Sequence, residues 1–281
     1  MALLNSIVSA WHLDSNANDA ADGNNLAVSG ATFNNSIFKL GTGAIQFDGI
    51  NDFCRMDLPS NLKTANFTYS AWIYLDVGWS SIGVILSGNP RQARVGGKGS
   101  IFQILPDQKA QIRIGDNSGS LSTTGGLTAM STGAWHHIVG SYDGTDLNLY
   151  LDGILDSQTS PAITIHWPDG AFGFPVPGQL YFGADKTNSL NCGSTCADRN
   201  FFFGLIDEIN IWDRALTDGG VAVGNTAGGE IAQLYNNGNG FEYPFVTGTR
   251  SRQARLLDIK QGFKKTGSQA ARIISTKGGF K

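Results

Sequence analysis

Two short alternating segments meet at a polar turn near the middle of the chain. Residues 135–151 read WHHIVGSYDGTDLNLYL, and the tetrapeptide DGTD separates the two segments. In the second segment leucine alternates with other side chains, which is the period of a strand that buries one face. Asp and Gly accept the dihedral angles of tight turns, and Asp152-Gly153 offers a second turn directly afterwards. We therefore expect three contiguous antiparallel strands here.

Similar short apolar segments recur along the chain, separated by Gly, Pro, Asn and Asp. A return every ~8–12 residues is typical of a β-sandwich or barrel. The 37 glycines and the 15% of charged residues suit short strands joined by tight turns, and 281 residues are compatible with one large all-β core. A single short helix is expected at residues 229–237, ended by Gly238. The other expected strands lie at residues 7–14, 43–57 (two strands around Gly49), 67–76, 84–86, 101–105, 111–114 and 203–212.

The chain holds no apolar run near the ~20 residues that a membrane-spanning helix needs. Its first residues do not resemble a signal peptide, so we expect a protein used inside a cell or built into a particle released by lysis, with export by another route left open. Three cysteines argue against a full disulfide framework. Cys192 and Cys196 either form a bridge or stay free thiols, and the missing signal favours free thiols.

Charge divides the chain into two parts. Residues 1–245 carry 11 Lys and Arg against 22 Asp and Glu, whereas residues 246–281 carry 9 against 1. We expect a folded domain over 1–245 and a basic tail over 246–281 that anchors the protein on an acidic surface, although a solvated flexible end has the same composition. The candidate anchoring residues are Arg250, Arg252, Arg255, Lys260, Lys264, Lys265 and Arg272.

An early loop, residues 15–25, is rich in Asn and Asp. Asp19 and Asp22 lie there, flanked by Asn18, Asn24 and Asn25, and oxygen ligands of this kind bind calcium. The alternative is an ordinary turn in which these side chains cap their own backbone. Spacing does not separate the two interpretations.

A carboxylate falls in the middle of the strand expected at residues 203–212. Strict alternation places Asp207 on the same face as Ile209 and Ile211, and Glu208 on the opposite face. A lone buried charge would cost several kcal/mol. We therefore expect Asp207 to meet backbone amides, an arginine or a metal ion.

Aromatic residues in loops are candidates for stacking on sugars. Residues 163–178 combine aromatics with prolines, which offer rigid flat surface at a small entropy cost. The same segment would equally serve as a lid over one end of the sandwich. The candidate glycan-binding residues are Trp79, His166, Trp167 and Phe172.

Several motifs in register resemble the concanavalin A-like jelly roll of the laminin G-like and pentraxin-like domains. They are AWHLD, AIQFDGINDF, FTYSAWIY, WHHIVGSYDG with LNLYLDG, FFGLIDEINIWDRAL and EIAQLYN, spread over residues ~6–240. The resemblance implies an all-β sandwich of two antiparallel sheets with a short C-terminal helix. It also implies a calcium ion near the rim, for which Asp19, Asp22 and Asp207 are the candidate ligands.

The resemblance includes glucanases, but the glutamates argue against catalysis. Glu208, Glu230 and Glu242 do not form the Glu-x-Asp-x-x-Glu pattern of laminarinase-like enzymes. His136 and His137 belong to a motif in which the family's histidines are not catalytic, so we expect them to pack. The chain is predicted to be no enzyme.

Two functions remain open for such a domain. We expect a virion structural or attachment protein, such as a phage decoration, fibre or tail-attached protein, whose basic tail binds capsid, tail or fibre subunits. The alternative is a free-standing adhesin, extracellular or at a cell surface, that binds a glycan with or without calcium. Nucleic acid binding by the tail is a weaker third hypothesis and would show a steep salt dependence.

Overall fold

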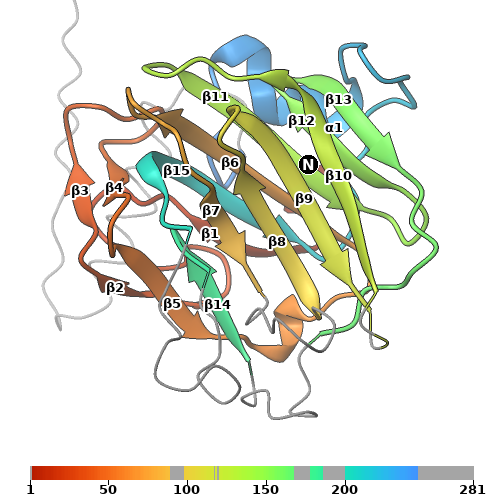
Figure 1. Ribbon diagram of the computed structural model, residues 1–281, viewed down its shortest axis with the longest axis horizontal. Coiled ribbons are helices and arrows are strands. Elements are labelled where there is room, and N and C mark those ends of the chain that lie inside the picture. The colour runs from red at the N-terminus through yellow and green to blue at the C-terminus, as the bar shows by residue number, and fades with distance from the viewer. Residues whose placement is uncertain are drawn as a thin grey trace, which may run out of the picture. The chain divides into compact units, whose positions relative to one another are not determined.

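The alternating segments form two antiparallel sheets in the computed structural model (Figure 1). The structure describes residues 2–88, 98–116, 118, 120–167, 178–185 and 200–245. The eight-stranded sheet has the order β13 (Ile154–Thr159), β12 (Leu147–Leu151), β11 (Trp135–Tyr142), β6 (Phe67–Leu75), β15 (Phe203–Trp212), β4 (Ala44–Asp48) and β3 (Thr32–Asn34), with β1 (Ile7–Trp11) also paired to β15. The seven-stranded sheet has the order β10 (Leu121–Ala129), β9 (Lys109–Gly115), β8 (Gly99–Ile104), β7 (Gly83–Ser87), β14 (Gln179–Phe182), β5 (Phe53–Asp57) and β2 (Ala27–Ser29). Within these described residues, the helical segments are α1 (Gly229–Tyr235) and the 3-10 turns η1 (Ala2–Leu4), η2 (Ser60–Leu62) and η5 (Asn236–Gly238).

The predicted hairpin is confirmed. β11 and β12 pair antiparallel from Ile138 opposite Leu151 to Tyr142 opposite Leu147, and β13 adds the third strand. Asp143 closes the turn because its Oδ1 accepts the amides of the residues two and three positions later, both at 2.7 Å. The turn chemistry and the apolar alternation therefore specify the same register.

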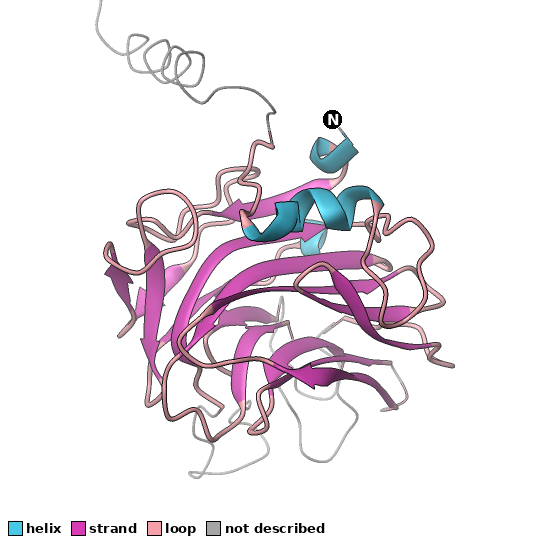
Figure 2. Ribbon diagram, turned by 90° about the horizontal axis from the view of Figure 1, so that it is seen from above, coloured by secondary structure: helices cyan, strands magenta, loops and turns pink. Residues whose placement is uncertain are grey.

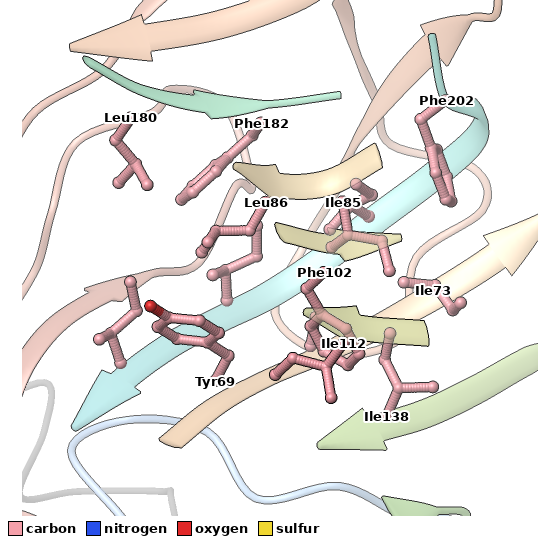
Figure 3. Packing of buried hydrophobic residues seen from close by; sticks show 14 of the residues in the cluster. Tyr69, Ile73, Ile85, Leu86, Phe102, Ile112, Ile138, Leu180, Phe182 and Phe202 are labelled. Carbon is pink, nitrogen blue, oxygen red and sulfur yellow. The ribbon is translucent and has the colours of Figure 1, made fainter. Parts of the chain in front are cut away.

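The main core fills the space between the two sheets (Figure 3). Each strand that faces it contributes alternate side chains, and burying one such aliphatic or aromatic group contributes ~1.5–3 kcal/mol. The side chains that meet there come from β6 and β11 on one side and from β7, β8, β9 and β14 on the other. They include Tyr69, Ile73, Ile138, Ile85, Leu86, Phe102, Ile112, Leu180 and Phe182.

A second apolar cluster covers the outer face of the eight-stranded sheet. Figure 2 shows the short helix lying across the strands on this side. The outer faces of β11, β12 and β15 pack there against α1 and the segment that follows it. The cluster includes Val139, Tyr150, Trp212, Leu216, Ile231, Leu234 and Phe245.

Strand β15 has the predicted bounds, but the predicted faces are wrong for its centre. The pairing with β6 shifts register between Asp207 and Asn210, and Glu208 takes a left-handed φ of 52°. This extra residue is a β-bulge, so Ile206 and Ile209 both reach the inter-sheet core. Asp207 therefore lies opposite Trp72 on the outer side of the sheet rather than beside Ile209.

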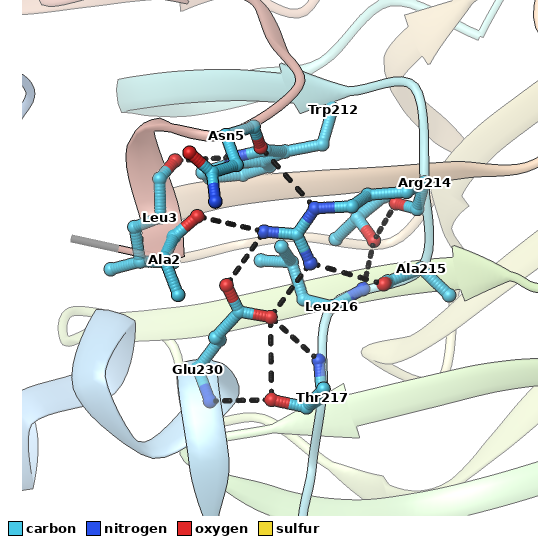
Figure 4. A network of polar contacts seen from close by, with 10 residues as sticks. Ala2, Leu3, Asn5, Trp212, Arg214, Ala215, Leu216, Thr217 and Glu230 are labelled. Atoms are coloured by element: carbon cyan, nitrogen blue, oxygen red, sulfur yellow. Dashed lines mark hydrogen bonds and ion pairs between the residues drawn. The ribbon is translucent and has the colours of Figure 1, made fainter.

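An ion-pair network fastens the N-terminal turn to the end of β15 and to α1 (Figure 4). Arg214 donates from Nη1 to Glu230 Oε2 at 2.7 Å and from Nη2 to Glu230 Oε1 at 2.6 Å. The same guanidinium donates to the carbonyls of Ala2 and Asn5. Glu230 Oε2 also accepts the Thr217 amide at 3.0 Å. Three segments far apart in the sequence thus share one arginine.

Some predictions fall on residues that the structure does not describe. These are the fate of Cys192 and Cys196, the position of Phe172 and the anchoring role of residues 246–281. Cys54 is a buried free thiol. None of the helices in the described ranges has the length and hydropathy of a membrane span.

Candidate functional site

A shallow pocket opens between the turn that follows β4 and the loop that follows β6. Its volume is about 180 Å³, below the ~300–1,000 Å³ of pockets that enclose a drug-sized ligand. A pocket of this size suits one ring of a longer ligand. It is lined by Asp48, Gly49, Gly78, Trp79, Ser80, Ser81 and Phe203.

The β4 side of the pocket depends on a close contact between Gly49 and Phe203. Gly49 has a left-handed φ of 75°, and a Cβ built there would lie 2.9 Å from the Phe203 Cβ. Asp48 holds the turn because its Oδ1 accepts the amides of Ile50 at 2.8 Å and Asn51 at 3.2 Å. Glycine is therefore required for the turn to lie against the start of β15.

The pocket joins polar groups to apolar surface. Ser80 and Ser81 are exposed, and their hydroxyls make no hydrogen bond within the described residues. Ile50 and Val77, adjacent in sequence to lining glycines, are 71% and 78% exposed. The exposed Ser80 and Ser81 thus share one pocket with the partly exposed Phe203.

Trp79 lines this pocket as a wall and not as a stacking platform. It is only 6% exposed, and its indole N–H donates to the Leu105 carbonyl at 2.9 Å. Its ring packs edge-on against Phe202 at 5.2 Å between centroids. Phe203, which the sequence analysis did not single out, supplies the more open aromatic surface.

His166 and Trp167 lie at another part of the fold. The Trp167 indole N–H donates to the Thr64 carbonyl at 2.7 Å, and its ring packs against the main core. The His166 amide donates to the Gly115 carbonyl at 2.9 Å. The two residues thus have structural contacts and are not brought to the pocket that Trp79 lines.

Asp19 caps the early loop with both carboxylate oxygens. Oδ1 accepts the amides of Ala10 at 2.8 Å and Ala21 at 2.9 Å, and Oδ2 accepts the Asn24 amide at 3.0 Å. Asp22 Oδ2 accepts the side-chain amide of Asn61 at 2.6 Å. These contacts match the Asx-turn alternative for this loop.

Asp207 accepts hydrogen bonds from backbone amides, which is one of the three partners predicted for it. Its Oδ2 accepts the amides of Lys39 at 2.8 Å and Leu40 at 3.0 Å. Burial, followed by the charge of Glu208, raises the pKa of Asp207 to about 8. In the described part of the chain, Asp207 forms no cluster of ligand atoms with Asp19 and Asp22, and the calcium site stays a prediction.

A cluster that sequence reasoning missed joins His12, Glu208 and Glu242. His12 Nδ1 lies 3.0 Å from Glu208 Oε1 and 3.8 Å from Glu242 Oε1. Burial works to lower the pKa of His12, but the hydrogen bond and charge of Glu208, together with the charges of Asp14 and Asp207, outweigh it and the pKa is raised. The three residues are far apart in sequence, and His12 in the AWHLD motif was the one visible signal.

The two neighbouring histidines have different environments, and only His137 is buried as the packing prediction expects. His136 Nδ1 contacts Asp152 Oδ2 at 2.7 Å, and its Nε2 accepts from both the hydroxyl and the amide of Ser131, at 3.0 and 3.2 Å. Because both groups belong to one residue five positions earlier, the imidazole closes a local turn. His137 is buried beside Trp72.

Comparison with known proteins supports the fold and the resemblance. The model of the concanavalin A-like lectin/glucanases superfamily matches residues 48–222, more than half of the chain. A search of curated proteins found no match. The binding domain of botulinum neurotoxin serotype D has a TM-score of 0.54 at 16% identity, covering 76% of this chain and 50% of that chain.

Two further solved structures are similar. The binding domain of botulinum neurotoxin DC in complex with SialylT has a TM-score of 0.56 at 13% identity and covers 83% of this chain and 51% of that chain. Domain 4 of AbnA, a GH43 extracellular arabinanase from Geobacillus stearothermophilus, in complex with arabinotriose, has a TM-score of 0.51 at 16% identity and covers 75% and 94%. This chain thus spans about half of the botulinum neurotoxin domains. At these identities the likeness shows the fold, a lectin-like jelly roll.

Proposed function

The chain belongs to the concanavalin A-like lectin/glucanases superfamily, and on that premise we propose that its sandwich is a non-catalytic carbohydrate-binding module. The solved structures that resemble it are mainly binding domains, and one is in complex with arabinotriose. The observation that carries the proposal is the open pocket in which exposed hydroxyls lie beside an aromatic ring.

The pocket binds one sugar ring of a longer glycan. The Phe203 ring packs against the C–H face of the sugar. Ser80 and Ser81 donate to and accept from sugar hydroxyls. The shallow shape leaves the neighbouring sugar units in solvent.

Replacing Phe203 by leucine is expected to weaken glycan binding by at least about tenfold. Leucine keeps apolar volume beside Gly49 but removes the flat ring that packs on the sugar. A glycan array identifies the ligand, and calorimetry on the best hit measures the loss.

Leu127→Ala is the matched control, because Leu127 is an exposed apolar residue on β10, in the other sheet. Unchanged affinity in Phe203→Leu, or equal losses in both variants, contradicts the assignment of this pocket. Running the array with and without calcium tests whether Asp19, Asp22 and Asp207 hold an ion that binding requires.

We further propose that the basic tail attaches this module to a larger particle, as a component of a phage virion. The supporting observation is the charge division: residues 246–281 carry 9 Lys and Arg against 1 acidic residue, which suits an acidic protein partner. The virion role and the free adhesin differ in whether the tail is needed.

Deleting residues 246–281 is expected to leave the sandwich folded and glycan binding unchanged, and to abolish incorporation into the native particle. The sheets and both apolar clusters are built from residues within 2–245, so we expect them to form without residues 246–281. Circular dichroism measures the fold, and mass spectrometry of purified particles measures incorporation. Undiminished incorporation of the truncated chain would rule out the anchor.

A further inference from the structure

The outer face of the eight-stranded sheet carries three ligand-bearing side chains that the glycan pocket does not use. His12 directly follows β1, Glu208 lies in the bulge of β15, and Glu242 belongs to the segment after α1. One nitrogen and two carboxylate oxygens of these residues all lie within 4.8 Å of one another. We propose that these three residues form a binding site for a divalent transition metal, with zinc as the preferred ion.

The spacing of the atoms fits tetrahedral coordination. Zinc binds imidazole nitrogen and carboxylate oxygen at ~2.0–2.2 Å, which sets neighbouring ligand atoms of a tetrahedron ~3.4 Å apart. The distances from His12 Nδ1 to Glu208 Oε1 and Glu242 Oε1, 3.0 and 3.8 Å, lie on either side of this value. Small rotamer adjustments would equalise them, with no change in the backbone.

The accessibility of the side chains suits an ion that enters from solvent. Glu208 is 2% exposed, whereas His12 and Glu242 are 26% and 22% exposed. A buried oxygen at the base and two partly open ligands at the mouth leave a path for the ion. The fourth position then faces solvent and holds water, as in zinc sites with three protein ligands.

A neighbouring buried oxygen provides independent support. Asp207 is fully buried, and its Oδ1 accepts no hydrogen bond although its Oδ2 accepts two. Asp207 precedes Glu208 in the chain and is close enough to interact electrostatically with both Glu208 and His12. A buried polar atom without a partner requires an explanation, and an ion with its bound water supplies one.

The ligand types select the metal. An imidazole nitrogen with two carboxylates suits zinc and neighbouring transition metals, whereas calcium takes six to eight oxygens. The proposed site is therefore distinct from the calcium prediction at Asp19, Asp22 and Asp207. Binding would join the first strand, the last strand and the C-terminal segment of the domain, and so stabilise the fold in proportion to occupancy.

The test uses the metal-free full-length chain. Calorimetry measures its binding of zinc, and the absorption spectrum of added cobalt(II) reports the coordination number. We expect one equivalent per chain, a cobalt d–d band typical of low coordination number, and no competition by calcium. His12→Gln and Glu242→Gln each remove a direct ligand on a partly exposed side chain, so both variants should fold and lose more than about 100-fold in affinity. His136→Gln is the matched control, because that histidine contacts Asp152 at another place on the sheet.

Three results would overturn the proposal. The first is the absence of stoichiometric zinc binding, and the second is an equal loss of zinc affinity in His136→Gln and His12→Gln. The third is a cobalt band that survives in His12→Gln. In each case the cluster would be a hydrogen-bonded one only. Glycan binding is measured separately on the same variants, so failure of the metal site and failure of the glycan pocket give different results.

Discussion

Replacing Arg214 by alanine is expected to lower the free energy of unfolding by about 3 kcal/mol, a value at the lower end for breaking a buried ion pair from one side. Glu230 is buried, and Arg214 is its charged partner through two hydrogen bonds of 2.6 and 2.7 Å. Without the guanidinium, the carboxylate keeps the amide and hydroxyl of Thr217 but loses its countercharge. The carbonyls of Ala2 and Asn5 also lose their donor, so the N-terminal turn should loosen.

Denaturant unfolding at pH 7 measures this loss, with Asp107→Ala as the control. Asp107 forms an ion pair with Lys109 at 3.7 Å on the surface, so its removal should change stability by less than about 1 kcal/mol. Arg214→Met combined with Glu230→Met should recover much of the loss, because no charge is then left buried. If Arg214→Ala changed the free energy of unfolding as little as Asp107→Ala, this would contradict a stabilising role for the ion-pair network in Figure 4.

The strands that bury side chains were predictable, and the exposed strands β2 and β10 were not. β6, β11, β12 and β15 follow the predicted segments because burial imposes the apolar alternation that the sequence displays. β10 has the sequence LSTTGGLTA and is largely exposed, so its positions give no periodic signal. β2 is exposed along its whole length. Hydrophobic periodicity reports burial, and it therefore misses strands held mainly by backbone hydrogen bonds.

The bulge at Glu208 shows where side-chain alternation fails to predict which face of a strand a residue occupies. A single extra residue reverses the side on which Asp207 lies, and no residue type in IDEIN announces it. The same limit applies to the candidate sites. Composition identified Trp79, but only the fold distinguishes the buried Trp79 ring from the more open Phe203.

Sites built from distant segments are the least predictable from sequence. His12 and Glu208 are 196 positions apart, and they meet because β1 pairs with β15. Glu242 reaches them because the segment after α1 returns across the outer face of the sheet, where the neighbouring Tyr243 and Phe245 pack. The order of strands in the sheet, and not any local motif, brings these ligands together.

The buried neutral imidazole of His137 should contribute stability that is lost in mild acid. His137 lies beside the Trp72 ring at 5.0 Å between centroids, and its Nε2 is 2.9 Å from the Ser70 hydroxyl. Burial lowers its pKa to about 3, while the charge of Asp152 opposes this shift and the charge of Lys39 adds to it. In the unfolded chain the pKa of histidine is ~6.5. Below pH ~6.5 the unfolded state therefore binds a proton that the folded state does not bind.

The sign of the effect follows from this difference in bound protons. The stability contributed by neutral His137 is fully present above pH ~6.5 and decreases by ~1.4 kcal/mol per pH unit as the pH falls toward the folded pKa. Asp207, with its pKa raised to about 8, changes stability in the opposite direction over much of this range. The wild-type protein alone can thus show a flat profile, and the comparison with a variant is needed.

We expect His137→Gln to remove this dependence, because glutamine does not titrate. The free energy of unfolding of the wild-type protein, relative to that of the variant, should fall by about 2 kcal/mol between pH 6.5 and 5, while the contribution of Asp207 cancels in the difference. Ser70→Ala is the control, since it removes the hydrogen bond of the imidazole but keeps its titration, and so should shift stability without changing the slope. A histidine NMR titration completes the test: a folded-state midpoint near 6.5 for His137, or a pH-independent difference between wild type and His137→Gln, would show that the imidazole takes up a proton within the fold and that its burial costs nothing in acid.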